Sequence, residues 1–599
     1  MTASLDLAVV GNSVLAALLD RTGRYVWCCF PRFDGDPVFC SLLDGSNEPR
    51  GGFFDITLER LAGSTQRYVG NTAIVETVLT DGDGASVRIT DFAPRFRRAG
   101  RMYRPMMLMR RVEPLMGRPR IRVRLRPRFN NGAIKPAMTV GSNHLRYVAG
   151  EQVVRLSTDA AVSYVAEEEP FVLAGPVHFV LGPDEGPTQS IAALVREFHD
   201  ETADYWVEWA RYLSVPFEWQ EAVIRAAITL KLCSFEETGA IVAALTTSIP
   251  EAPHSGRNWD YRYCWLRDAY FVVHALNRLG ATRTMEEFII FITNVAALDP
   301  GGRLKPVYGI LASRDLAERE VTTLTGYRGM GPVRVGNLAH VQVQNDSYGS
   351  VVLAAAQMFF DRRLARQGDL ELFRQLEALG AKAAELGLTP DAGLWEFRGR
   401  ARVHTHSAVM CWAACRRLAK IAQRLELQDR AAHWYAEADR LRSAIIERAW
   451  NAQLNSFVAS FGGEDIDASL LLLQEVGFLS ASDPRFLGTL AQVEQRLRRG
   501  DHLLRYDTPD DFGLPHTSFT VCTFWYIDAL AVVGRRDEAR ALFERVLAAR
   551  NHVGLLSEDV DPATGELWGN FPQTYSLVGL IICAMRLSRT WEEAFWRDS

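Results

Sequence analysis

Two glutamates in the second half of the chain could act as an acid–base pair. Glu396 lies between Trp395 and Phe397, and apolar neighbours favour the protonated carboxyl that a general acid requires. Glu558 adjoins further acidic residues and would ionise where it faces water or a hydrogen-bond donor, as a general base must. Two carboxylates in one pocket are the arrangement for glycoside hydrolysis, where one protonates the leaving oxygen and the other activates water.

Each glutamate also has a less specific interpretation. Glu396 could be a surface residue in a turn, and Glu558 could belong to a helix-capping or calcium-binding acidic turn. Asp559 and Asp561 lack the other ligands of a known calcium loop, and nothing near His404 and His406 completes a metal site. We therefore expect no metal ion and no cofactor.

Residues 257–268 combine side chains that suit a sugar. Tyr261 and Trp265 offer aromatic faces for C–H surfaces, and Arg267 and Asp268 can form paired hydrogen bonds with hydroxyl groups. A buried Arg–Asp pair that stabilises the start of a helix is an equally weighted alternative. The composition alone does not decide between a sugar pocket and a structural ion pair.

These residues lie in the longer connections of a helical region. We predict twelve helices, near 217–234, 264–279, 282–298, 342–367, 369–387, 404–424, 427–448, 466–475, 483–498, 517–533, 535–549 and 573–588. Short and long loops alternate between them, and long loops in a compact domain are usually functional. Six helical hairpins with all long loops at one end predict an (α/α)6 barrel. An irregular array or a solenoid is the alternative.

The preceding region has the pattern of strands. Residues 74–79 and 85–90 flank the turn Asp-Gly-Asp-Gly, and residues 120–126 alternate between charged and apolar side chains. We predict an antiparallel β-sandwich domain over 1–186, a connecting helical linker over 187–216 and a catalytic barrel domain over 217–599.

Composition excludes several classes of protein. The 599 residues carry 67 basic and 72 acidic side chains, for a net charge of −5, which argues against nucleic-acid binding. No apolar run is long enough to span a membrane, and the first residues lack the basic region of a secretory signal. The nine cysteines are scattered, as is usual for free thiols in a reducing compartment. We expect a cytoplasmic protein without a membrane partner.

Five motifs occur in an order that resembles glycoside hydrolase family 15, the family of glucoamylases, glucodextranases and bacterial trehalases. The most specific is Asn-Trp-Asp-Tyr-Arg-Tyr-Cys-Trp-Leu-Arg-Asp at 258–268. Other matches are residues 27–34, 332–344, 405–412 and Gly-Asn-Phe-Pro-Gln at 569–573. The resemblance covers nearly the whole chain and implies a β-sandwich followed by an (α/α)6 barrel.

The resemblance also implies roles for individual residues. Glu396 would be the general acid and Glu558 the general base of an inverting, exo-acting α-glucosidase that releases β-glucose. The substrate-binding residues implied are Tyr261, Trp265, Arg267, Asp268, Trp395, Arg505 and Tyr506. Arg267 and Asp268 would bind the non-reducing glucose, and the tryptophans would form pocket walls.

The chain departs from the starch-type pattern of the family at two places. Phe397 stands where glucoamylases have a second glutamate, and Thr517 with Ser518 and Phe519 replaces a Glu-Gly-Thr-Phe stretch. The expected partner is therefore a small α-glucoside, such as trehalose or an isomalto- or malto-oligosaccharide. The sequence does not predict the linkage or the oligomeric state.

Two other classes of function remain as alternatives. A disaccharide phosphorylase or an epimerase could use the same barrel, although a phosphorylase needs a phosphate site in place of the base. A non-catalytic sugar-binding protein could keep the pocket, but both glutamates are retained.

Overall fold

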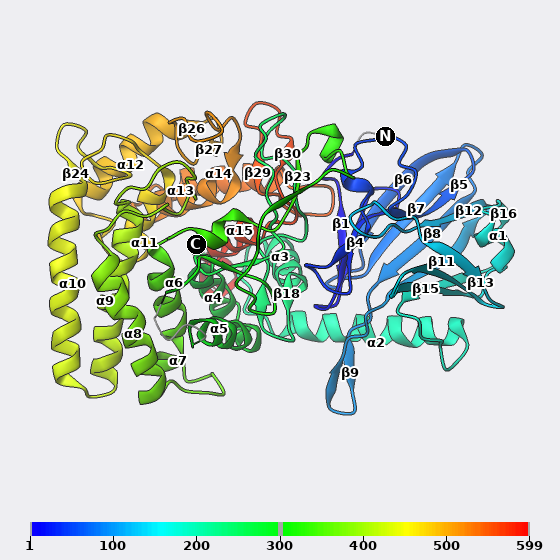
Figure 1. The fold of residues 1–599 in the computed structure, drawn as a ribbon, viewed down its shortest axis with the longest axis horizontal. Coiled ribbons are helices and arrows are strands. Elements are labelled where there is room, and N and C mark those ends of the chain that lie inside the picture. The colour runs from blue at the N-terminus through cyan, green and yellow to red at the C-terminus, as the bar shows by residue number, and fades with distance from the viewer. Residues whose placement is uncertain (1–2, 298–302, 597–599) are drawn as a thin grey trace.

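A computed structural model describes residues 3–297 and 303–596. Its N-terminal part contains two antiparallel sheets (Figure 1). The first has the order β1-β2-β3-β5-β12-β16, with β4 beside β3: β1 (Ala8–Gly11), β2 (Ala16–Leu19), β3 (Tyr25–Phe30), β4 (Asp36–Phe39), β5 (Phe53–Leu58), β12 (Arg120–Arg126) and β16 (Phe171–Val172). The second has the order β13-β14-β15-β17-β11-β8-β7-β6: β13 (Ala137–Val140), β14 (His144–Ala149), β15 (Gln152–Thr158), β17 (Val177–Gly182), β11 (Leu108–Met116), β8 (Ser86–Phe92), β7 (Val75–Asp81) and β6 (Leu61–Tyr68).

The two sheets share one hydrophobic core, to which the inward side chains of both contribute. Burial alternates along β7 and β12, as the period of a strand requires. A buried ion pair crosses this core: Arg110 Nε donates to Asp91 Oδ1 over 2.7 Å, and the Tyr25 hydroxyl donates to the same oxygen over 3.0 Å. The predicted antiparallel β-sandwich is confirmed.

A long helix follows the sandwich along the chain. Helix α2 (Ile191–Arg211) begins at Ser190, whose side chain accepts a hydrogen bond from the backbone of Ala193. It packs against β17 and the projecting hairpin of β9 (Phe96–Arg98) and β10 (Arg101–Tyr103), and it runs from the sandwich towards the helices (Figure 1).

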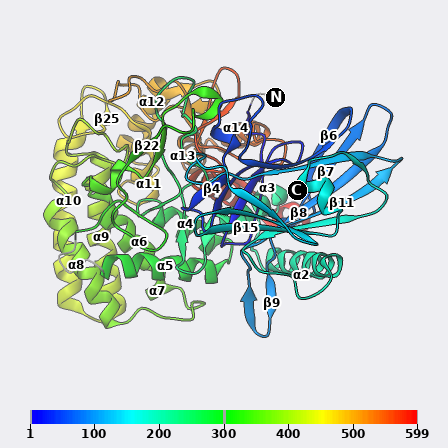
Figure 2. The ribbon, with the colours of Figure 1, turned by 45° about the vertical axis from the view of Figure 1, so that its right-hand side comes forward.

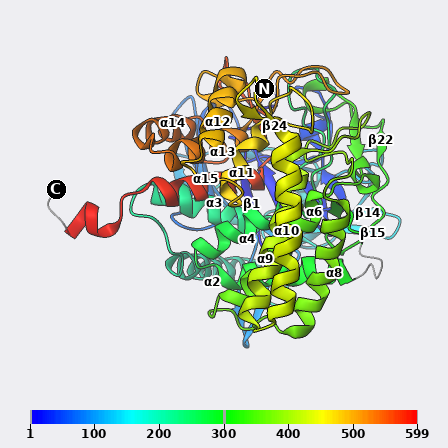
Figure 3. The ribbon, with the colours of Figure 1, turned by 90° about the vertical axis from the view of Figure 1, so that its left-hand side faces the viewer.

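The rest of the chain forms the helical barrel. Its helices are α3 (Gln220–Leu232), α4 (Ala269–Arg278), α5 (Thr282–Ala297), α6 (Asp346–Ala355), α7 (Gln357–Phe360), α8 (Leu370–Leu386), α9 (Thr405–Arg424), α10 (Gln428–Ala449), α11 (Leu472–Glu475), α12 (Pro484–Leu497), α13 (Thr520–Val532), α14 (Arg536–Ala548) and α15 (Thr574–Leu587). Figure 3 shows α8, α9 and α10 side by side at the end away from the sandwich, where both α8 and α10 contact α9.

Connections between these helices alternate in length. Residues 279–281, 425–427 and 533–535 are tight turns, whereas 233–268, 387–404, 498–519 and 549–573 are long. The long connections contain short strand pairs, including β20 (Cys264–Trp265) with β21 (Val307–Tyr308), β22 (Arg319–Val321) with β23 (Val333–Val335), and β28 (Ser518–Phe519) with β29 (Asp559–Val560) and β30 (Leu567–Trp568). The fold class predicted from the alternation of loops is confirmed.

The sandwich packs directly on the barrel, and one core includes residues of both (Figure 2). Trp27 Nε1 of the sandwich donates to the carbonyl of Leu245 over 2.8 Å, and Asn551 donates to the carbonyls of Leu5 and Leu7. In addition, the buried carboxylate of Glu236 forms an ion pair with Lys231. The loops of the barrel are therefore fixed partly by the N-terminal sheets.

Two further features bear on the class of protein. Over the ranges that the structure covers, no helix is long and apolar enough to cross a membrane. All nine cysteines are buried and unpaired.

Candidate active site

The long connections line one pocket, with about 890 Å³ of space between its walls, its open mouth included. Its walls are mostly aromatic and charged: Glu251, Arg257, Trp259, Tyr261, Trp265, Arg267, Asp268, Asn337, Gln342, Trp395, Glu396, Phe397, Arg398, Arg505, Tyr506, Asp510, Asp511, Phe512, Phe519, Gln573 and Tyr575 are among them.

Eight of the nine residues predicted for the site line this pocket, and they come from segments far apart in the sequence. They are Tyr261, Trp265, Arg267, Asp268, Trp395, Glu396, Arg505 and Tyr506. The ninth, Glu558, is fully buried and lies directly behind the pocket wall, in contact with Tyr261.

Glu396 lies on a strained turn between α8 and α9. Its φ of 59° is in the left-handed region, which costs a non-glycine residue about 1–3 kcal/mol and is often found at functional sites. Trp265 Nε1 donates to Glu396 Oε1 over 2.6 Å, and Arg267 Nη2 donates to the same oxygen over 3.2 Å. The carboxyl is thus held by two donors, and its side chain remains 24% exposed.

The sequence predicts apolar neighbours for Glu396, and the structure adds a charged one. Trp395 and Phe397 line the same pocket as Glu396, while Trp395 donates through Nε1 to Asp467 over 3.0 Å and Phe397 stacks on His404. The carboxyl of Glu396, on its left-handed backbone, accepts from Trp265 and from the charged group of Arg267.

Glu558 is held on both oxygens. The Tyr261 hydroxyl donates to Oε1 over 2.7 Å, and the backbone N–H of Asn570 donates to Oε2 over 3.1 Å. Gly569 makes this approach possible, because a Cβ at this position would lie 2.7 Å from Glu558 Oε2. Each carboxylate oxygen can accept a further hydrogen bond, so the group keeps capacity for a water molecule.

A cluster of acidic groups surrounds Glu558. Burial raises the pKa of Glu558 well above its usual value, and the negative charges of Glu251 and Asp559 raise it further, while Arg505 opposes them. Arg505 Nη2 donates to Glu251 Oε2 over 2.7 Å and lies 3.2 Å from Asp559 Oδ1. Burial also raises the pKa of Asp559, to about 7. The Arg505 guanidinium therefore pairs with two carboxyl groups and lowers the pKa of a third, Glu558, through its charge.

The opposite part of the pocket is built on Arg267 and Asp268. Arg267 Nη1 donates to Gln344 over 2.9 Å, and its Nε lies 3.7 Å from Asp268 Oδ1. That Asp268 oxygen and the Tyr575 hydroxyl are both buried and have no hydrogen-bond partner among the described residues. Burial raises the pKa of Asp268 to about 7. Two unsatisfied polar groups beside a guanidinium suit the hydroxyl groups of a sugar.

Aromatic rings separate these polar groups. Tyr261 and Trp265 meet edge to face with ring centres 5.3 Å apart, and Trp395 meets Tyr506 at 5.8 Å. The Tyr506 hydroxyl donates to Asp510 over 2.5 Å. These rings give the pocket the apolar surfaces that sugar C–H groups require.

The 257–268 segment is fixed by buried contacts with the rest of the molecule. Arg262 forms a two-pronged ion pair with Asp260, at 2.9 and 2.7 Å, and donates to the carbonyl of Gly35 in the sandwich over 2.9 Å. Asn570 donates to the carbonyl of Trp259 over 2.9 Å. The same asparagine thus anchors both the aromatic segment and Glu558.

Several pocket residues were not predicted as site residues. Glu251 and Tyr575 carry no motif signal, since a lone glutamate after a proline and a tyrosine at a helix start are common. Arg398 and Phe512 follow predicted residues in the sequence, and their proximity to Glu396 and Tyr506 was the available signal. His404 and His406 do not belong to a metal-binding group. Among residues 3–297 and 303–596, no group of three or more His, Cys, Asp or Glu side chains could hold a metal ion.

A pocket of aromatic rings with carboxyl groups, on a β-sandwich and an (α/α)6 barrel, fits a protein that binds carbohydrates, and comparisons with known proteins identify it as a glycoside hydrolase and give its family. Residues 219–585 match the model described as glycosyl hydrolases family 15, and residues 4–174 match the trehalase-like N-terminal domain. The chain belongs to glycoside hydrolase family 15.

Relatives match over nearly the full length. A trehalase of Thermoplasma volcanium is 33% identical, over 96% of this chain and 92% of its own. A trehalase of Mycobacterium tuberculosis is 30% identical, over 98% of this chain and 90% of its own. The fold is similar to that of a bacterial glucoamylase solved with acarbose, at 15% identity and a TM-score of 0.67, over 98% and 94% of the two chains.

Proposed function

We propose that this protein is an inverting, exo-acting α-glucosidase of small α-glucosides, with trehalose as its first candidate substrate. The proposal rests on two carboxyl groups, each bound by one of the two adjacent aromatic side chains Tyr261 and Trp265. Tyr261 donates to Glu558 and Trp265 donates to Glu396, and the two rings are in contact. The curated relatives called trehalases support the choice of substrate.

In this mechanism, Glu396 is the general acid and Glu558 the general base. The terminal glucose binds against Arg267 and Asp268, whose unpartnered Oδ1 accepts a hydrogen bond from a sugar hydroxyl. Glu396 gives its proton to the glycosidic oxygen as the bond to C1 breaks. Glu558 removes a proton from the water that attacks C1 from the opposite face, and β-glucose leaves.

Glu396 is paired with Arg267, whose Nη2 lies 3.2 Å from Glu396 Oε1. A sugar that hydrogen bonds to Arg267 competes for this guanidinium, and Asp268, 3.7 Å from the same group, is an alternative partner for its charge. Substrate binding therefore weakens the contact between Arg267 and Glu396 and frees this carboxyl to face the glycosidic oxygen.

We also propose the division into a sandwich domain over 1–186, a linker over 187–216 and a catalytic domain over 217–599. The position of α2 (Ile191–Arg211), between the last sandwich strand β17 and the first barrel helix α3, supports it.

A panel of α-linked glucose disaccharides, scored by release of glucose, tests the function. We expect trehalose or another disaccharide to be hydrolysed faster than soluble starch, because Phe397, which lines the pocket, stands where starch-type members of the family have a second glutamate. A preference for starch over every disaccharide would contradict the substrate class. Strict dependence on phosphate with release of glucose 1-phosphate would indicate a phosphorylase instead.

A further inference from the structure

The arginine two residues after the general acid lines the pocket and is firmly held. Arg398 Nη1 and Nη2 donate to the two oxygens of Glu318 over 3.1 and 2.9 Å. Its backbone N–H donates to Asp511 Oδ2 over 2.7 Å, which ties the turn of Glu396 to the loop over 504–517. Neither Arg398 nor Glu318 has a part in the chemistry described above.

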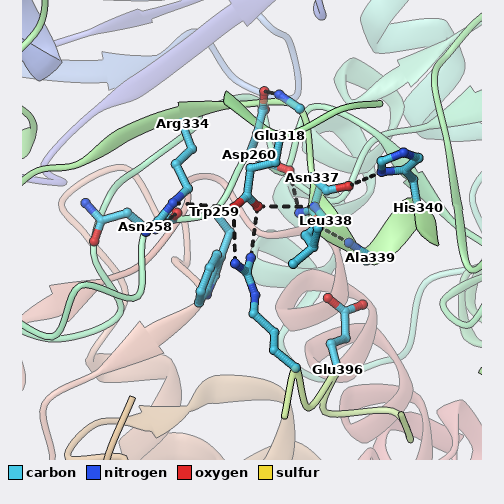
Figure 4. Close-up of polar contacts among 12 residues, drawn as sticks. Asn258, Trp259, Asp260, Glu318, Arg334, Asn337, Leu338, Ala339, His340 and Glu396 are labelled. Atoms are coloured by element: carbon cyan, nitrogen blue, oxygen red, sulfur yellow. Dashed lines mark hydrogen bonds and ion pairs between the residues drawn. The ribbon is translucent and has the colours of Figure 1, made fainter. Parts of the chain in front are cut away.

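Two aromatic rings flank this guanidinium. The Arg398 guanidinium carbon lies 4.5 Å from the ring centre of Trp259 and 5.7 Å from that of Phe512, and these rings meet edge to face at 5.1 Å. Arg334 lies 5.2 Å from the Trp259 ring, with its Nε 3.5 Å from Glu318. Trp259, Glu318, Arg334, Arg398 and Phe512 are named here the outer wall. Figure 4 shows three of them, Trp259, Glu318 and Arg334, grouped to one side of Glu396.

The outer-wall residues Trp259, Arg398 and Phe512 line the pocket together with Asp511, an exposed residue at its mouth. With the terminal glucose against Asp268 and the glycosidic oxygen at Glu396, the sugar on the other side of the scissile bond extends towards this mouth. That sugar needs an aromatic face and charged hydrogen-bonding groups. Arg398 has five N–H donors, of which Glu318 occupies two, so donors remain for hydroxyl groups.

We propose that Arg398, against Trp259 and Phe512, binds the leaving sugar of a disaccharide and so determines substrate specificity, while Glu318 is a positioning residue that orients Arg398. This inference rests on the proposed α-glucosidase function. Phe397 cannot hydrogen bond to this sugar through its side chain, and Arg398, one residue further along, provides the charged contact.

Two substrates separate binding of the leaving sugar from the rest of the reaction. Trehalose carries a sugar as its leaving group. In α-D-glucosyl fluoride the leaving group is fluoride, so this substrate needs the site for the terminal glucose and the two glutamates but not the site for the leaving sugar. For Arg398→Ala we expect kcat/KM on trehalose to fall about 10- to 100-fold, the range for a lost hydrogen bond to a charged group. The rate on α-D-glucosyl fluoride should change less than about threefold.

Further variants keep the test informative. Arg398→Lys retains the charge but not the two-pronged pair with Glu318, so it should recover part of the trehalose activity. Glu318→Gln should raise KM for trehalose more than it lowers kcat, with the rate on α-D-glucosyl fluoride again unchanged.

Arg400→Ala is the matched control, since Arg400 also stacks on an aromatic ring, at 4.4 Å from Phe397, but does not line this pocket. Its activity on both substrates should remain at the wild-type level.

If Arg398→Ala lowered kcat/KM equally on both substrates, or did not lower it on trehalose, the specificity role of Arg398 would be overturned. The proposed hydrolase function would still stand. The activity on α-D-glucosyl fluoride serves as a measure of folding within the same experiment. If the wild-type protein hydrolysed neither substrate, the proposed function would fail, and this inference with it.

Discussion

The hydroxyl of Tyr261 donates a hydrogen bond to Oε1 of Glu558 over 2.7 Å, although the two residues are 297 positions apart in the chain. Glu558 is fully buried beside two other carboxyl groups. The bond from Tyr261 stabilises its ionised form, which a general base needs. The tyrosine therefore connects the aromatic wall of the pocket to the proposed general base.

Replacement of this tyrosine tests the link. We expect Tyr261→Phe to lower kcat/KM by about 10- to 100-fold, because it removes a hydrogen bond to a charged group. Steady-state kinetics on the preferred disaccharide measure the effect. Tyr263→Phe is the control, since the Tyr263 hydroxyl accepts from the backbone of Gly336 and does not line the pocket. Similar activity for the two variants would remove Tyr261 from its proposed role.

The two glutamates should be essential for turnover but not for folding. We expect Glu396→Gln and Glu558→Gln each to reduce kcat by about 100- to 10,000-fold, the usual contribution of a general acid or base. Melting temperatures should change little. Glu426→Gln is a matched control, because Glu426 is an exposed residue with a similar φ of 61° in a connection between helices. Turnover near the wild-type level in either pocket variant would exclude that residue.

Much of the fold follows from patterns within the sequence, but the electrostatics of the site do not. Alternating short and long loops between amphipathic helices predict the barrel, since each helical hairpin is a local structure. The charge of Glu251 raises the pKa of Glu558 only because two loops that are distant in the sequence meet near Arg505. The sequence neighbours of Glu396 likewise did not predict that its carboxyl accepts from Trp265 and Arg267, because these residues lie in a distant loop.

The acidic cluster gives the activity a defined pH dependence. Burial raises the pKa of Glu558, as do the charges of Glu251 and Asp559, so kcat/KM should fall as the pH drops through this raised value and the base becomes protonated. Glu251→Gln removes one negative charge, lowers the pKa of Glu558 and should move the acidic limb of the profile to lower pH. Glu566→Gln, on the surface, is the control. An unchanged acidic limb, or a shift to higher pH, would contradict this assignment.

A buried ion cluster between sandwich and barrel should control stability. Burial would raise the pKa of Glu236, but Lys231 and Arg95 hold it far below its usual value. We expect Glu236→Gln to destabilise the protein by about 3–5 kcal/mol near neutral pH, because it leaves buried cations unpaired. A depressed carboxyl pKa stabilises the fold above the unfolded value of about 4.3, so the difference should shrink as the pH falls below it.

Denaturant unfolding of Glu236→Gln and wild type at several pH values measures this effect. The exposed neighbour Glu237 gives the control variant Glu237→Gln, which should unfold with the wild type. A Glu236→Gln protein as stable as the wild type at neutral pH would show that the cluster contributes little.

The anomeric form of the first product tests the proposed reaction most directly. In the proposed mechanism Glu558 activates a water on the face opposite Glu396, so the glucose that is attacked should leave as the β-anomer, while the leaving glucose of trehalose should retain its α configuration. Proton NMR of trehalose hydrolysis, recorded before mutarotation, should therefore show α- and β-glucose appearing in equal amounts. Initial release of α-glucose alone would contradict the assignment of Glu396 and Glu558 as an inverting acid–base pair.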